Sequence, residues 1–127
     1  KPSGTTFPLL GLVAAGAGLE AVAQNDRIDL GEMFSGKNHY ALQVRGQSMI
    51  EDHIDEGDIV IIRKQEMADN GERVVAMIEG NATLKKFYRR KTQVVLEPSN
   101  STMEPIIVDS TRDIKVLGIL VGVIRKC

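Results

Sequence analysis

Three short segments combine residue types that could cut a peptide bond. Ser48 lies in Gly46-Gln47-Ser48-Met49, and Lys85 lies in Thr83-Leu84-Lys85-Lys86. A serine hydroxyl becomes a good nucleophile only when a base takes its proton, and a neutral lysine amine can act as that base. Upstream, Val13-Ala14-Ala15-Gly16 is a run of small residues that would fit a narrow cleft. The pattern indicates a nucleophile, its base and a cleavable bond on one chain.

The residues alone do not decide which lysine would be the base. In a strand over residues 82–88, Lys85 shares a face with Phe87, whereas Lys86 lies on the other face. A lysine base must be neutral, which requires burial to lower its pKa from about 10.4. Neither face is cleanly apolar. Both lysines therefore equally fit exposed positions on an edge strand, with their stems along the surface.

Ser48 also has two interpretations. It follows a predicted strand and precedes a short predicted helix over residues 49–54. A serine at such a turn exposes its hydroxyl, and nearby backbone N–H groups can stabilise an oxyanion. The same geometry fits a serine that simply caps the helix.

Composition excludes several classes of protein. The 127 residues are 43% apolar and 26% charged with a net charge of −1, which indicates a globular domain without a general attraction to nucleic acid. Cys127 is the only cysteine, so no disulfide can form within the chain, and we expect a cytoplasmic protein. With only His39 and His53 beside it, we expect no metal site and no cofactor. No apolar run approaches the roughly 18 residues of a membrane span, so we expect no membrane partner.

Turn residues divide the chain into a short arm and one domain. Glycines and prolines in residues 1–25 predict a flexible linker that holds the cleavage-site segment, and residues 26–127 predict the folded domain. Turn signals there separate short β-type segments, namely 40–44, 58–62, 73–78, 82–88, 92–97, 106–108 and 114–124. The sequence therefore predicts a mainly β, antiparallel fold that is curved or partly closed.

Together these segments resemble the self-cleaving C-terminal domain of the LexA repressor family, over nearly the whole chain. Val13–Gly16 resembles its cleavage site, Val44–Met49 its nucleophile segment and Thr83–Lys86 its base strand. Further matches are Glu56–Asp58, Glu97–Asn100, Pro105–Val108 and Gly118–Arg125. The resemblance implies a LexA/signal-peptidase-like fold of highly twisted antiparallel sheets that is partly barrel-like.

The resemblance also implies a role for each residue. Ser48 would attack the Ala15–Gly16 bond in cis, with Lys85 rather than Lys86 as the general base. The backbone N–H groups of Gln47 and Ser48 would form the oxyanion hole.

The partners implied are those of a transcriptional repressor of the SOS DNA-damage response. A RecA filament on single-stranded DNA would stimulate the cleavage that inactivates the repressor. Operator DNA would be bound only through an N-terminal DNA-binding domain, which we expect to be absent from this chain. A homodimer would form through the C-terminal strand Val116–Ile124, although that apolar segment equally fits a central strand of the monomer's own sheet.

Other identities stay open. Thr6–Leu9 and Arg27–Leu30 resemble UmuD-type proteins, self-processing accessory subunits of a translesion DNA polymerase, but those usually have cysteine where this chain has Ala15. Lambda-type phage repressors share the same peptidase domain. A trans-acting relative of signal peptidases and a non-enzymatic binding module are the remaining alternatives.

Overall fold

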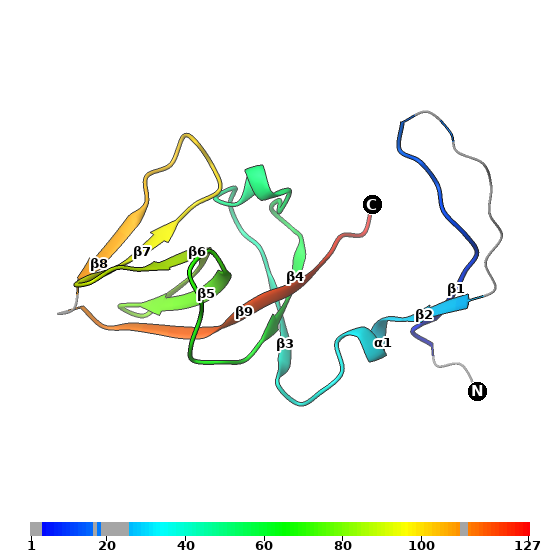
Figure 1. The fold of residues 1–127 in the computed structure, drawn as a ribbon, viewed down its shortest axis with the longest axis horizontal. Helices are drawn as coiled ribbons and strands as arrows, with labels where there is room; N and C mark the ends of the chain where they lie inside the picture. Colours follow the sequence, from blue (N-terminus) through cyan, green and yellow to red (C-terminus); the bar gives the residue numbers. More distant parts are fainter. Residues whose placement is uncertain (1–3, 17, 19–25, 110–111) are drawn as a thin grey trace. The chain divides into compact units, whose positions relative to one another are not determined.

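The computed structural model describes residues 4–16, 18, 26–109 and 112–127 (Figure 1). The chain divides into two compact units, residues 1–36 and 37–127. The first unit holds β1 (Thr6–Leu9), β2 (Asp26–Asp29) and α1 (Leu30–Met33). The second holds β3 (His39–Gln43), the 3-10 helix η1 (Ile50–Asp52), β4 (Ile59–Arg63), β5 (Arg73–Ile78), β6 (Asn81–Arg89), β7 (Gln93–Glu97), β8 (Ile106–Asp109) and β9 (Ile114–Ile124).

Asp29 organises the first unit. β1 and β2 pair antiparallel, with Thr6 opposite Asp29. The Asp29 carboxylate accepts hydrogen bonds from the hydroxyl of Thr5 at 2.8 Å and from the backbone N–H of Gly31 at 2.9 Å, so it caps α1. The hydrogen bond from Thr5 is the main reason that the pKa of Asp29 is lowered. One carboxylate thus joins the strand pair to the helix.

The second unit is built on one antiparallel sheet of seven strands in the order β3-β4-β9-β5-β6-β7-β8 (Figure 1). The mainly β prediction is confirmed, and β5 and β9 match their predicted ranges residue for residue. β3 and β8 are the two edges, so the sheet is open rather than closed into a barrel. β9 is a central strand of this sheet, between β4 and β5.

β5 is buried on both faces, which explains its continuous apolar run. Val74 and Ala76 pack in one core with Phe87, whereas Val75 packs in a second core with Met49. Side chains alternate between the two faces of a strand, so the two cores lie on opposite sides of β5.

Two β-bulges bend β9. The pairing register skips Leu117 opposite β5 and Val121 opposite β4. A bulge frees a backbone carbonyl, and the Tyr40 hydroxyl donates a hydrogen bond to the carbonyl of Leu117 at 3.0 Å. Tyr40 therefore supplies the partner that the bulge removes, and burial raises the pKa of its hydroxyl.

Gly118 lies where β9 crosses the end of β4. Its φ is 159°, and a Cβ atom there would lie 2.5 Å from the backbone oxygen of Arg63. A side chain at this position would force the strands apart, so the crossing requires glycine.

The structure differs from the predicted flexible arm at β1. Thr6–Leu9 form a strand even though Pro8 removes one backbone donor, because Pro8 lies in a two-stranded sheet that has no interior strand. The rest of the predicted linker lies partly outside the described residues, at 1–3, 17 and 19–25.

An ion pair between a half-exposed arginine and a buried aspartate joins the end of β9 to the turn before β4. Asp58 is 3% exposed, and its two carboxylate oxygens accept hydrogen bonds from Nε and Nη2 of Arg125, each at 2.7 Å. Arg125 Nη2 also donates to the backbone carbonyl of His53 at 3.0 Å. These bonds lower the pKa of Asp58 to about 2. Arg125 thereby holds both ends of the segment between η1 and β4.

We expect Arg125→Leu to lower the melting temperature at neutral pH, because it leaves Asp58 buried without its cation. The pKa of Asp58 is lower in the folded chain, so its contribution is complete above 3.8 and is lost as the pH falls through about 2. The difference from the parent protein should therefore shrink in acid. Arg112→Leu is the matched control, since its partner Glu79 is exposed, and it should change stability by about 0.5 kcal/mol or less. Thermal melts across the acid range would measure both, and equal effects would contradict the assignment.

Candidate active site

A cleft of about 300 Å³ lies in the second unit between β3 and the first half of β6. It is lined by Leu42, Gln43, Val44, Arg45, Ser48, Met49, Val60, Val75, Ala82, Thr83, Leu84 and Lys85. β7 pairs with β6 only from Lys86 onward, so residues 81–85 of β6 have no strand partner on that side within the described chain. The cleft therefore lies beside two open strand edges.

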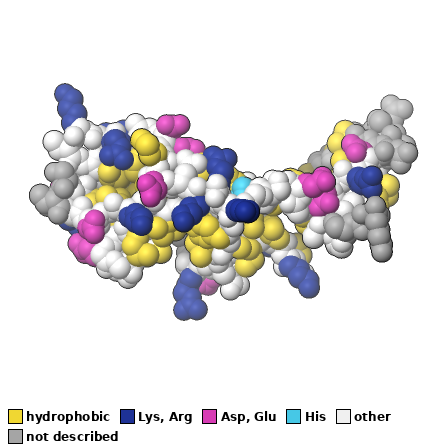
Figure 2. Space-filling view, turned by 90° about the horizontal axis from the view of Figure 1, so that it is seen from below, with side chains coloured by type: hydrophobic (Ala, Val, Ile, Leu, Met, Phe, Trp, Pro, Cys, Tyr) yellow, Lys and Arg dark blue, Asp and Glu magenta, His cyan; other side chains and the backbone are white. Residues whose placement is uncertain are grey.

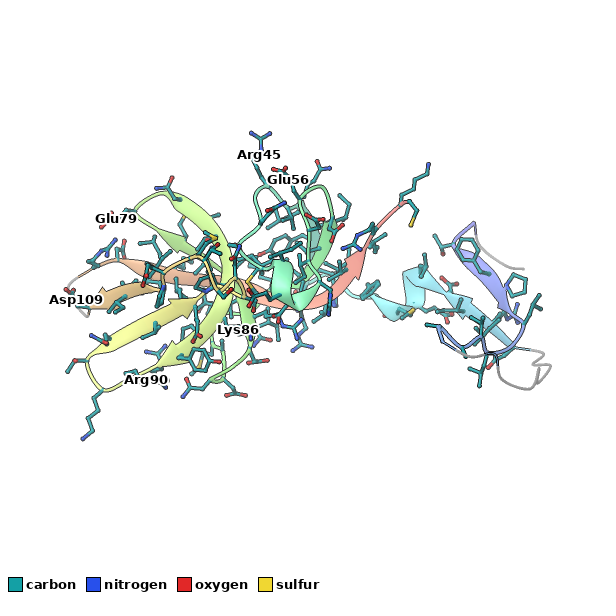
Figure 3. The ribbon with its side chains drawn as sticks, turned by 90° about the horizontal axis from the view of Figure 1, so that it is seen from above. Arg45, Glu56, Glu79, Lys86, Arg90 and Asp109 are labelled. Carbon is teal, nitrogen blue, oxygen red and sulfur yellow. The ribbon has the colours of Figure 1, made fainter. Side chains whose placement is uncertain are left out.

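Ser48 lies in the turn between β3 and η1. Gly46 begins the turn with a φ of 88°, in the left-handed region that glycine adopts without strain. Met49 is 2% exposed and anchors the next residue in the second core. Glu56 accepts a hydrogen bond from the N–H of Gly46 at 2.9 Å, and Arg45 and Glu56 project on the same side of this unit (Figure 3). Ser48 is thus held between the buried Met49 and a turn that the hydrogen bond to Glu56 stabilises.

Lys85 brings its amine to this serine. Its Nζ donates hydrogen bonds to Ser48 Oγ at 3.1 Å and to Thr83 Oγ1 at 2.5 Å. The residue is only 7% exposed, and burial lowers the pKa of its amine. Desolvation disfavours the ammonium form, so the neutral amine that can accept a proton becomes easier to reach.

Lys86 is placed differently. Its Nζ lies 3.7 Å from Asp52, which also contacts Arg73 at 3.3 Å. Of the two lysines that strand alternation could not separate, Lys85 is the one that contacts Ser48 and Lys86 is the one in an ion pair.

The N–H groups of Gln47 and Ser48 stay predictions as oxyanion donors. Neither donates a hydrogen bond within the described part of the chain. Both groups are therefore available to an incoming oxygen beside the Ser48 hydroxyl.

The predicted cleavage-site residues lie in the first unit. Ala15 and Gly16 form a bend there and both are exposed. Val13, two residues before Ala15, is 93% exposed. The bond between Ala15 and Gly16 is thus accessible.

Two polar residues of the site were not identified from the sequence. Thr83 contacts the Lys85 amine, and strand alternation could have found it because it lies two residues before Lys85 on the same face. Asn100, in the β7–β8 loop, donates a hydrogen bond from Nδ2 to the Gln47 carbonyl at 2.8 Å. No local pattern indicates that contact, because 53 residues separate the two.

The Peptidase S24-like family model matches residues 8–121, which include every residue of this site. The chain belongs to the Peptidase S24-like family. This match confirms the resemblance of the chain to a self-cleaving peptidase domain that the sequence motifs indicate.

Similar proteins carry the name LexA repressor. The chain is 45% identical to the one from Syntrophobacter fumaroxidans, over 95% of this chain and 59% of that protein. It is 47% identical to the one from Thermotoga petrophila, over 94% of this chain and 62% of that protein. The one from Desulforamulus reducens is 45% identical, over 95% of this chain and 56% of its own length. The chain thus spans about three fifths of the length of the curated relatives it matches.

Within the described residues, no helix has the length and apolar character needed to cross a membrane.

We expect Lys85→Met to stabilise the fold at neutral pH, by on the order of 1 kcal/mol. The pKa of Lys85 is lower in the folded chain than its usual 10.5, so the unfolded chain binds more protons between the two values and stability rises with pH there. Methionine removes this penalty, and its advantage should disappear as the pH approaches 10.5. Lys86→Met is the matched control and should show no such gain. Denaturant melts at neutral and alkaline pH would measure both, and a gain for Lys86→Met alone would contradict the burial argument.

Proposed function

We propose that this chain is the self-cleaving peptidase domain of a LexA-type repressor of the SOS DNA-damage response. The observation that carries the proposal is the 3.1 Å contact between Lys85 Nζ and Ser48 Oγ in a cleft with open strand edges. The family and the names of the relatives support a repressor with peptidase activity.

The reaction proceeds by covalent catalysis. Neutral Lys85 takes the proton of the Ser48 hydroxyl, and Ser48 Oγ bonds to the carbonyl carbon of Ala15. The N–H groups of Gln47 and Ser48 hold the oxyanion. The bond to Gly16 breaks as its nitrogen receives the proton from Lys85, and water then releases Ala15 as a carboxylate.

The cleavage segment enters the cleft in an extended conformation. An extended peptide can pair with open strand edges through its backbone, and β3 and the first half of β6 provide such edges. Ala14 and Ala15 are small enough for a cleft of about 300 Å³. Because the bond is on the same chain, its effective concentration is high and tight substrate binding is unnecessary.

Control of the reaction comes from a partner. A RecA filament on single-stranded DNA stimulates cleavage by favouring the state in which the segment occupies the cleft and Lys85 is neutral. The repressor is a cytoplasmic protein, and a DNA-binding domain outside this chain contacts operator DNA.

The surface shown in Figure 2 carries basic and acidic side chains interspersed over one face, and the net charge of the chain is −1.

We expect the purified chain to cut itself between Ala15 and Gly16, leaving residues 16–127, and to do so faster as the pH rises and Lys85 loses its proton. Intact-mass spectrometry after incubation at neutral and strongly alkaline pH would detect the products. Ser48→Ala and Lys85→Ala should stay intact, whereas Lys86→Ala should cleave like the parent because Lys86 pairs with Asp52. A folded parent protein with unchanged mass at every pH would refute the proposal.

The C-terminal strand also supports a homodimer. β5 pairs with β9 only as far as Ile119, so β4 is the only strand that pairs with residues 120–124 of β9 within the described chain. Val123 is 41% exposed and Ile124 is 39% exposed on this segment. An open apolar edge of this kind pairs readily with a second copy across a two-fold axis.

We expect Val123→Lys to weaken the dimer, because it places a charge at the edge that the two copies share. Sedimentation velocity at a protein concentration on the order of tens of micromolar should show a dimer for the parent protein and a monomer for the variant. Ile107→Lys is the control, since Ile107 is 53% exposed on β8 at the other end of the sheet. A monomeric parent protein, or a dimer lost only with Ile107→Lys, would exclude this interface.

A further inference from the structure

The β7–β8 loop, residues 98–105, lies against the nucleophile turn. In Figure 1 this loop passes close to η1. The N–H of Glu51 donates to the carbonyl of Ser99 at 2.8 Å, and the N–H of Ser101 donates to Glu51 Oε2 at 2.6 Å. The bond from Ser101 is the main reason that the pKa of Glu51 is lowered. The loop is therefore fastened to η1 by contacts that do not involve Asn100.

Asn100 uses both ends of its side-chain amide. Its Oδ1 accepts hydrogen bonds from the N–H of Thr102 at 3.0 Å and from the Thr102 hydroxyl at 2.7 Å. Its Nδ2 donates to the carbonyl of Gln47 at 2.8 Å. The Thr102 bonds orient the amide, so that the donating end faces the turn that carries Ser48.

The Gln47 carbonyl belongs to the same peptide group as the N–H of Ser48. That group is planar and trans, so its carbonyl and N–H point in opposite directions. The carbonyl is held from one side by Asn100 and also accepts from the N–H of Ile50 at 3.3 Å. Fixing the oxygen therefore fixes the direction of the N–H, which donates no hydrogen bond within the described chain.

We propose that Asn100 is a positioning residue for self-cleavage, which orients the Ser48 N–H toward the oxyanion by holding the Gln47 carbonyl. This inference rests on the proposed function. An oxyanion donor is effective because it is already aligned when charge develops, so a loosened peptide group slows the chemical step. Asn100 does not contact Lys85 and should leave the titration of the base unchanged.

The test is the rate of self-cleavage as a function of pH for Asn100→Ala. The plateau at high pH should fall about 10- to 100-fold, a loss comparable with that of a weakened oxyanion donor. The midpoint of the profile, which reports the titration of Lys85, should stay where it is in the parent protein. A general loss of structure would not separate plateau from midpoint in this way.

Thr102→Val is the matched control. It removes the hydroxyl bond to Asn100 Oδ1 but keeps the bond from the Thr102 N–H, which still orients the amide. Its plateau should therefore fall much less than that of Asn100→Ala and stay within about threefold of the parent. If Asn100→Ala fails to fold, Asn100→Asp decides, because it keeps the shape and the acceptor for Thr102 and replaces the donating NH2 group with an oxygen that cannot donate to the Gln47 carbonyl. The new carboxylate of Asn100→Asp changes the electrostatic potential at Lys85 and can move the midpoint of the pH profile. For this variant, only the cleavage rate at high pH is therefore compared with the parent.

Each outcome bears on one claim. A parent-like plateau in the folded Asn100 variants, a shifted midpoint in Asn100→Ala, or an equal loss in Thr102→Val would overturn the positioning role. In all three cases cleavage of the parent at Ala15–Gly16 would leave the proposed function standing. A parent protein that does not cleave, with Ser48→Ala behaving identically, would overturn the proposed function and this inference with it.

Discussion

The burial of one amine is the constraint around which the second unit is arranged. Lys85 is 7% exposed, and a buried ammonium group is unfavourable unless it is neutralised or well hydrogen-bonded. Its only side-chain partners in the described chain are two hydroxyls, Ser48 and Thr83, and no carboxylate is among them. A carboxylate would have stabilised the charged form. The site instead favours the loss of a proton, which costs stability and gives the neutral amine that the proposed reaction requires.

The stability that offsets this cost comes from the rest of the sheet. β5 is buried on both faces and separates two apolar cores, which together contain most of the buried side chains described. The cleft lies at the border of one core, where Met49 anchors the Ser48 turn and Val75 lines the cleft. Lys85 therefore lies on a packed strand, and Ser48 lies on a hydrogen-bonded turn. Such support keeps reacting groups aligned better than a free loop could.

Much of this arrangement could be predicted from the sequence, for identifiable reasons. Alternating β-branched segments between turn signals located the strands of the sheet, and β5 and β9 were predicted to the residue. Alternation could not choose between Lys85 and Lys86, because polar and apolar residues are mixed on both faces of the β6 segment. The Asn100 contact and the Arg125–Asp58 ion pair join residues 53 and 67 positions apart, which no local pattern encodes. The strand pair β1–β2 was not predicted, because Pro8 and the neighbouring glycines obscure its pattern.

The central position of β9 has a consequence for the order of folding. β3 and β4 flank the Ser48 turn, and β6, which is paired with β5, carries Lys85. In the sheet these two strand pairs are joined only through β9. β9 is also the last strand of the sheet to leave the ribosome. Pairings between distant segments form late, so the two halves of the sheet cannot be joined by strand pairing until β9 has been synthesised. Ser48 and Lys85 therefore meet in their final geometry only in a chain whose sheet is complete. The self-cleavage proposed above would have to wait until β9 has been synthesised.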